Sequence, residues 1–281
     1  MIIEFKNHWM NYGSNEKVMI NKIYLEKNPI LKKSHAKLTI NDFKLNALIG
    51  RGSFGKVLHV TKLDTNKIYA IKVIKKEFII ENGEVENTKS ERKIMEIINH
   101  PFIIKLRFAF QSDKKLYLVM DYCPGGELYN IIKKNGRIDE NLARFYAAQI
   151  LLALEELHKN KILYRDLKHE NILLEQDGYI KLTDFGLSKF GKSSSPKSSK
   201  RPKGTGEYLP PEIINGNEFT ENSDWWTFGI LLYEMLVGRT PFYSSNDSLL
   251  VTQITLCDPK FPSLISMLAK DLISVFSFRN Y

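Results

Sequence analysis

The chain has 281 residues, of which 43% are apolar and 26% are charged, a composition typical of ordinary globular proteins. Its net charge of +9 comes from residues 1–40, with +4, and residues 190–204, with +5, and basic charge confined to a tail and a loop argues against a nucleic-acid-binding surface. No apolar run reaches membrane-spanning length, and Cys123 and Cys257 lack the spacing of a disulfide framework or a zinc site, so we expect a cytoplasmic protein, with the nucleus as the alternative.

The first part of the chain predicts a tail followed by a β-rich lobe. Residues 1–42 have no sustained hydrophobic period, no signal-peptide order and no Gly at position 2 for a myristoyl group, so we interpret them as a tail of unknown role. Short β-type runs fill residues 43–73, and a polar helix is expected over Asn87–Ile98. Two more strands are expected over Lys105–Phe110 and Leu116–Met120.

The second part of the chain predicts a helical lobe. Apolar residues recur at helical spacing within Glu140–Asn160, and Trp225–Val237 is apolar nearly all round, which is typical of a buried helix. Because strands come first and helices later, the fold class is α+β, in two lobes joined near residues 121–126. Residues 191–204 form a low-complexity, flexible basic loop in this interpretation.

The stretch GRGSFGKV, Gly50–Val57, fits two phosphate-binding patterns at once. It matches the dinucleotide-binding GxGxxG and the Walker A GxxxxGK. Both patterns need a helix directly afterwards, because the helix N-terminus holds the phosphate. The run KVLHVTK alternates as a strand does, and Val57 stands where Walker A needs Ser or Thr to hold magnesium. Neither pattern is fulfilled, and the loop alone indicates no more than a hairpin.

Lys72 lies within the apolar run YAIKVI, where an unpaired ammonium group would be costly. We therefore expect Lys72 to have a carboxylate partner. Glu91, on the predicted helix, is the candidate, although a helix Glu is usually only a surface residue.

The stretch YRDLKHENILLEQDGYIKLTDFG, Tyr164–Gly186, concentrates polar residues around a short hairpin. The predicted strands Ile172–Leu174 and Tyr179–Leu182 are joined by an Asp-Gly dipeptide, which is a hairpin signal. The polar residues that flank this hairpin are Asp166, Lys168, Asn171 and Asp184.

In chain order, GRGSFGKV, YAIK, SERKIM, YRDLKHEN, DFG, GTGEYLPPE and DWWTFG resemble the signature of the eukaryotic protein kinases. YRD in place of HRD, VMDYCPGGEL and GYIKLTDFGLSK resemble the AGC group, which contains the cyclic-nucleotide-dependent kinases. The resemblance implies a bilobal kinase domain over residues 43–281, with an N-lobe 43–120, a hinge 121–126 and a C-lobe 127–281. It also implies phosphorylation of protein Ser and Thr hydroxyls, because Tyr kinases usually lack the Lys of DLKHEN.

The resemblance assigns the catalytic and metal-binding roles. Asp166 would orient the substrate hydroxyl and take its proton, and Lys168 would stabilise the γ-phosphate. Asn171 and Asp184 would hold two Mg²⁺ ions, which prefer oxygen ligands.

ATP binding is implied for residues of both lobes. Lys72 would grip the α- and β-phosphates while held by Glu91, the glycine loop would cover them, and Met120 would be the gatekeeper behind adenine. The full set implied for ATP is Gly50, Gly52, Ser53, Phe54, Gly55, Val57, Ala70, Lys72, Glu91, Met120, Asp121, Cys123, Leu173 and Thr183.

Protein substrates with Arg or Lys two to three residues before the target hydroxyl are the expected partners. Glu127, Glu170 and Glu234 match carboxylates that grip such residues in the AGC group. Thr205 would face Asp166. An upstream activating kinase is a further expected partner, and we expect a monomer.

Several positions depart from the family pattern. His169 replaces the Pro of DLKPEN, which is more typical of tolerated loop variation than of a functional switch. Gly206 and Pro210 replace the Pro of GTPEY and the Ala of APE. Arg201 occupies the position of the activating phosphothreonine. Candidates for that phosphate, or ordinary loop residues, are Ser198 and Ser199.

The sequence stops at Arg279-Asn280-Tyr281, where AGC relatives continue to an Arg that pairs with the Glu of APE, here Glu212. We therefore expect a truncated chain with marginal stability and weak activity, unless Arg239 or another Arg reaches Glu212. Two functions stay open: an active Ser/Thr kinase, and a truncated or inactive kinase-like protein that binds nucleotide or a partner.

Overall fold

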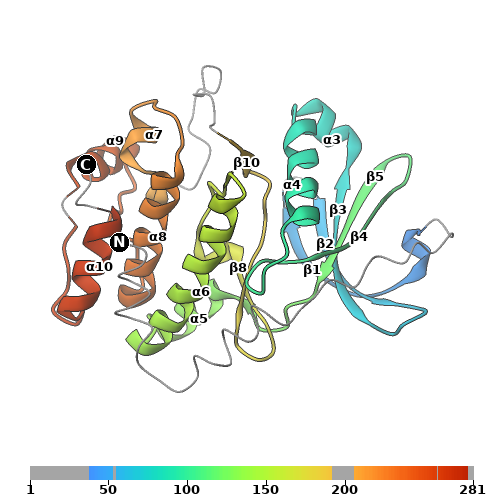
Figure 1. The fold of residues 1–281 in the computed structure, drawn as a ribbon, viewed down its shortest axis with the longest axis horizontal. Coiled ribbons are helices and arrows are strands. Elements are labelled where there is room, and N and C mark those ends of the chain that lie inside the picture. Colours follow the sequence, from blue (N-terminus) through green and yellow to red (C-terminus); the bar gives the residue numbers. More distant parts are fainter. Residues whose placement is uncertain (1–37, 53–54, 192–205, 258, 278–281) are drawn as a thin grey trace. The chain divides into compact units, whose positions relative to one another are not determined.

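The computed structural model describes residues 38–52, 55–191, 206–257 and 259–277, drawn in colour in Figure 1. The chain forms two compact units that divide between Tyr122 and Cys123. Some residues singled out in the sequence lie outside the described residues: the tail up to residue 37, Ser53, Phe54, Ser198, Ser199, Arg201, Thr205 and Arg279-Asn280-Tyr281.

The first unit is built on a five-stranded antiparallel sheet with the order β1-β2-β3-β5-β4. Each strand corresponds to a β-type run of the sequence. For β4 and β5, whose two ends were predicted, each observed end differs from the predicted one by one residue. The strands are β1 Phe43–Gly52, β2 Gly55–Lys62, β3 Ile68–Lys75, β4 Leu106–Gln111 and β5 Lys115–Asp121.

The register of this sheet separates two faces, because side chains alternate along a strand and paired residues share a face. β3 pairs Lys72 with Val57 and Leu118, and Ala70 with Met120, so these side chains lie on one face. The opposite face carries the buried cluster of Phe43, Leu58, Val60, Tyr69, Ile71, Val73, Tyr117 and Val119.

Two helices lie beside the sheet, α3 Lys76–Glu81 and α4 Val85–Ile97 (Figure 1). The predicted start of α4 at Asn87 was wrong by two residues. Asn87 lies inside the first turn, where its side chain donates to Glu84, the residue that precedes the helix. The buried residues of α4 are Glu91, Ile94 and Met95.

The second unit is mainly helical, and α8 is its centre. Helix α8 packs against α6 and α10, and almost all of its residues after the first turn are buried. Its N-terminus is four residues earlier than predicted, because Thr220 and Ser223 form a capping box ahead of the apolar run. The helices are α5 Leu128–Asn135, α6 Glu140–Lys159, α7 Pro211–Ile214, α8 Glu221–Val237, α9 Asp247–Leu256 and α10 Met267–Ser277. Every helix among the described residues is too short or too polar to span a membrane.

Two small sheets complete the second unit: β6-β8-β9, and β7 paired with β10. The predicted hairpin is present as β8 and β9, which pair antiparallel, and its turn holds Gly178 at φ +83°. This hairpin places Asn171 before its first strand and Asp184 after its second. The strands are β6 Gly126–Glu127, β7 Ile162–Leu163, β8 Ile172–Leu174, β9 Ile180–Leu182 and β10 Lys189–Phe190.

Candidate active site

Three polar residues before the hairpin form one connected cluster. Nζ of Lys168 lies 3.0 Å from Oδ2 of Asp166. The side-chain amide of Asn171 donates to the same Oδ2 at 2.8 Å and to the backbone oxygen of Asp166 at 2.7 Å. The Asp166 carboxylate is therefore fixed in one orientation by a cation and an amide. Asp166, Lys168 and Asn171 were all predicted as site residues, and the structure brings them together.

A buried carboxylate on α8 holds the segment that leads into this cluster. Asp224 is fully buried and accepts hydrogen bonds from the backbone N–H groups of Tyr164 at 2.9 Å and Arg165 at 2.8 Å. It also lies 2.8 Å from Nε2 of His158. Arg165 has φ +70°, an unfavourable conformation for a residue with a side chain, and the bonds to Asp224 stabilise it directly before Asp166.

Burial raises the pKa of Asp166 above its ordinary value, and Asp184 adds to the rise. Lys168 and Asn171 oppose this rise by stabilising the carboxylate. A carboxylate whose pKa is raised toward the working pH accepts a proton more readily, which suits a general base.

Asn171 and Asp184 were predicted as magnesium ligands. Because the amide nitrogen of Asn171 is bound by Asp166, its carbonyl oxygen is the atom that could hold a cation. Asp184 is exposed and has φ +56°, and its Oδ1 accepts the N–H of Gly186 at 3.3 Å. The N–H of Thr183 donates to the Asn171 backbone at 3.0 Å, which ties the two ends of the hairpin together. Two oxygen ligands suit Mg²⁺, which usually takes one or two carboxylates and completes its shell with phosphates and water.

In the first unit, Nζ of Lys72 lies 2.7 Å from Oε1 of Glu91. The buried Glu91 on α4 is therefore the partner that the apolar surroundings of Lys72 required. Lys72 shares its sheet face with Val57, Ala70 and Met120. Four residues implied for ATP thus lie on the face of the sheet where Glu91 anchors the ammonium group.

The glycine loop connects β1 and β2 as a hairpin, which agrees with the strand expected after it. Gly55 has no room for a side chain, because a Cβ there would collide with the backbone oxygen of Val73 on β3. Beside Gly52 there is open space within 4 Å of where a Cβ would be. A backbone without side chains at such positions lets a ligand approach its N–H groups closely.

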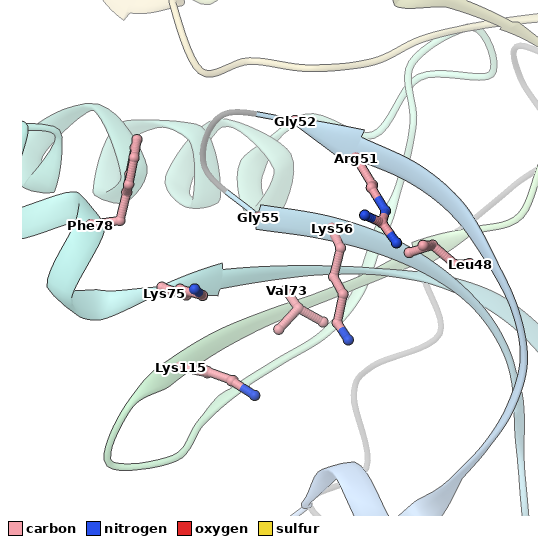
Figure 2. A pocket seen from close by; sticks show the side chains of 9 residues that line it. All are labelled: Leu48, Arg51, Gly52, Gly55, Lys56, Val73, Lys75, Phe78 and Lys115. Carbon is pink, nitrogen blue, oxygen red and sulfur yellow. The ribbon is translucent and has the colours of Figure 1, made fainter.

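A pocket of about 450 Å³ lies beside this hairpin, but on the other face of the sheet (Figure 2). Val73 lines it, and Val73 alternates with Lys72 along β3, so the pocket lies on the sheet face opposite Lys72. Two residues of the glycine loop that are implied for ATP, Gly52 and Gly55, also line this pocket. Its lining is basic, with no acidic residue. The cations around it are Arg51, Lys56, Lys75 and Lys115.

Two side chains of the segment predicted as the hinge are bound or buried. The carboxylate of Asp121 forms two hydrogen bonds to Arg107, at 2.6 and 2.9 Å, so its side chain is already used. Cys123 is buried, and Gly126 completes the turn at φ +71°. In the second unit, Leu173 on β8 pairs with Glu127 on β6.

The three carboxylates predicted to bind basic substrates differ in exposure. Glu170 is exposed, Glu127 is half-buried and Glu234 on α8 is buried. Burial raises the pKa of Glu127, and the neighbouring charge of Glu170 raises it further.

His169 lies among these carboxylates, and sequence reasoning assigned no role to its side chain. Burial lowers the pKa of His169, but the hydrogen bond to Glu234 and the charges of Glu234, Glu170 and Glu127 outweigh burial, so its pKa is above the ordinary value. The sequence feature that could have pointed to this residue was the imidazole itself, at a position where the protein kinases that the sequence resembles have Pro.

Glu212, the predicted anchor of the substrate-positioning segment, has Ser223 as its side-chain partner, at 2.5 Å from Oε1. Its Oε2 atom is buried and accepts no hydrogen bond from a described residue. Arg239 does not pair with Glu212 in the described part of the chain, so this alternative partner is not observed.

Residues 43–277 match the family described as "Protein kinase domain". A RAC family serine/threonine-protein kinase homolog of Dictyostelium discoideum is 46% identical over 86% of this chain, and the match covers 54% of that protein. Protein kinase 2 of the same organism is 48% identical over 87% of this chain and 50% of the relative. cAMP-dependent protein kinase type 3 of Saccharomyces cerevisiae is 41% identical over 92% of this chain and 64% of the relative. The chain thus spans about half to just under two thirds of these relatives' lengths.

Proposed function

This chain belongs to the protein kinase family, among the serine/threonine kinases of the AGC group, and we propose that it transfers the γ-phosphoryl group of Mg-ATP to Ser or Thr hydroxyls of proteins. The observation that carries this proposal is the fixed carboxylate of Asp166, held between Lys168 and Asn171. The names of two relatives, a serine/threonine-protein kinase homolog and a cAMP-dependent protein kinase, agree with it.

Asp166 has the properties of the group that orients and deprotonates a hydroxyl. Its carboxylate is oriented by two partners, and burial raises its pKa. Lys168, at 3.0 Å from it, supplies a positive charge for the negatively charged phosphoryl group during its transfer. Phosphoryl transfer needs little covalent help, so placement and charge account for most of the catalysis.

Each unit offers its own residues for nucleotide binding. In the first unit, Lys72 presents an ammonium group fixed by Glu91 beside a hairpin whose glycines leave its backbone open. In the second unit, Asn171 and Asp184 would hold Mg²⁺, which neutralises phosphate charge when bound. Asp121 and Cys123 would meet the adenine through their backbone, since the Asp121 carboxylate is bound to Arg107.

Substrates with basic residues before the target hydroxyl are the proposed class. Glu127 and Glu170 offer two carboxylates close enough for the charge of one to raise the pKa of the other. A guanidinium between them would relieve that repulsion through charge-assisted hydrogen bonds.

The experiment that tests the proposed function has two steps, because a binding module could pass the first. Mg-ATP should raise the melting temperature of the purified chain, and the chain should then transfer radiolabelled phosphate to Ser and Thr peptides with upstream arginines. Stabilisation by Mg-ATP without transfer to any peptide would reject the kinase function and favour the binding module. A preference for acidic or proline-directed peptides would reject the basic substrate class alone.

A further inference from the structure

His169 is bound on three sides by side chains of other elements. Its Nδ1 lies 2.8 Å from Oε2 of Glu234 on α8 and 2.7 Å from the hydroxyl of Tyr208. Its ring stacks on that of Tyr129 on α5, with centroids 5.0 Å apart and an interplanar angle of 20°. Its Nε2 lies 3.6 Å from a carboxylate oxygen of Glu170. A tolerated loop residue would face solvent, whereas this side chain is 13% exposed.

The Glu234 carboxylate is occupied by these contacts. Its Oε2 accepts the Tyr208 hydroxyl and faces Nδ1 of His169, so the two donors converge on one oxygen. No described residue donates to Oε1. A guanidinium binds a carboxylate best through two parallel hydrogen bonds, one to each oxygen. With Oε2 taken, an incoming arginine could form only a single bond to Glu234.

We propose that His169 acts as an internal substitute for a substrate's basic side chain: it occupies Glu234 and so removes one of the three carboxylates from the recognition of basic residues. This inference rests on the proposed function. The remaining carboxylates, Glu127 and Glu170, would then select the basic residue, and the position that Glu234 would read would show weak selectivity. His169 is thus a specificity-determining residue that acts through Glu234.

The test is an arginine scan. A neutral peptide with one central Ser is compared with peptides that carry a single Arg at each position before it. Binding is measured by fluorescence anisotropy for the wild-type chain, His169→Ala and His169→Pro. His100→Ala, which removes an imidazole from the first unit, is the matched control. At the peptide position that Glu234 would read, the ratio of the affinity for the Arg peptide to that for the neutral peptide should rise about tenfold in both His169 variants. The same ratio should stay unchanged in the control.

Glu234 must carry this gain. His169→Ala combined with Glu234→Gln should return the preference to that of the wild type, and melting curves identify any variant that fails to fold. The inference is overturned if the folded His169 variant shows an unchanged preference for Arg at every position, or if the gain survives Glu234→Gln. It is also overturned if neither the wild type nor any variant binds the peptides. Because binding needs no turnover, failure of phosphate transfer rejects the proposed function without deciding the role of His169.

Discussion

Nζ of Lys72 lies 2.7 Å from Oε1 of Glu91, and the pair joins the third strand of the sheet to helix α4. The Glu91 side chain is 5% exposed, and this ammonium group lies in direct contact with its charge. The position of α4 is therefore linked to the presence of the lysine. A charge that is held in this way is also oriented for a ligand on the same sheet face.

Breaking this pair should reduce both stability and nucleotide binding. Lys72→Met leaves a buried carboxylate without its cation, which we expect to cost about 3–5 kcal/mol of unfolding free energy. Chemical denaturation and titration with a fluorescent ATP analogue measure the two effects. The matched control is Glu96→Gln, which breaks an exposed pair with Arg92 on the same helix and should change stability by less than about 1 kcal/mol. Equal effects of the two substitutions would show that the buried pair has no special role.

Asp166→Asn and Asp184→Ala should both abolish phosphoryl transfer, with losses of at least about 100-fold, but for different reasons. Asp166→Asn removes the proton acceptor and should leave Mg-dependent nucleotide binding near that of the wild type. Asp184→Ala removes a metal ligand and should weaken Mg-dependent nucleotide binding. Peptide turnover measures the loss of transfer in each variant. ATP binding, measured with and without Mg²⁺, distinguishes the loss of the proton acceptor from the loss of the metal ligand. Near-normal turnover in either variant would contradict the assigned roles.

Asp224→Ala should destabilise the second unit strongly. The substitution leaves the N–H groups of Tyr164 and Arg165 without their acceptor in a buried place, and removes the partner of His158. We expect a loss of about 3 kcal/mol or more in unfolding free energy and a lower melting temperature. Asp113→Ala, in an exposed turn, serves as control and should shift the melting temperature little. A melting temperature equal to that of the wild type would mean that Arg165 keeps its conformation without Asp224.

Glu127 should make stability depend on pH in the acid range. Burial and the charge of Glu170 raise its pKa in the folded chain, so the folded state binds a proton more readily than the unfolded state does. The ionised carboxylate is therefore a stability penalty at neutral pH, and this penalty is relieved as pH falls through the raised pKa. Glu127→Gln, which cannot titrate, should have the higher melting temperature near pH 7, and the difference should close toward about pH 4. A difference that widens at acid pH would contradict this assignment.

Local sequence determined most secondary elements and the partner of Lys72. Alternation predicted the five strands, the Asp-Gly dipeptide predicted the β8–β9 hairpin, and helical spacing predicted α6, because these signals depend on residues a few positions apart. The pairing of Lys72 with Glu91 followed from the cost of an unpaired buried charge. Helices α4 and α8 start two and four residues earlier than predicted; a capping box sets the start of α8, whereas the residue before α4, Glu84, forms no side-chain cap. Helices α3, α5, α7 and α9 were not predicted.

The surroundings of His169 were decided by tertiary structure alone. Its hydrogen-bond partners Tyr208 and Glu234 are 39 and 65 positions away in the chain, and the stacked ring of Tyr129 comes from yet another helix. A sequence pattern records which residue types are present, whereas an imidazole becomes a ligand of a carboxylate only when separate elements bring both to hydrogen-bond distance. Burial then fixes the electrostatics, because the charges of Glu127, Glu170 and Glu234 act on His169 through a weakly screening interior.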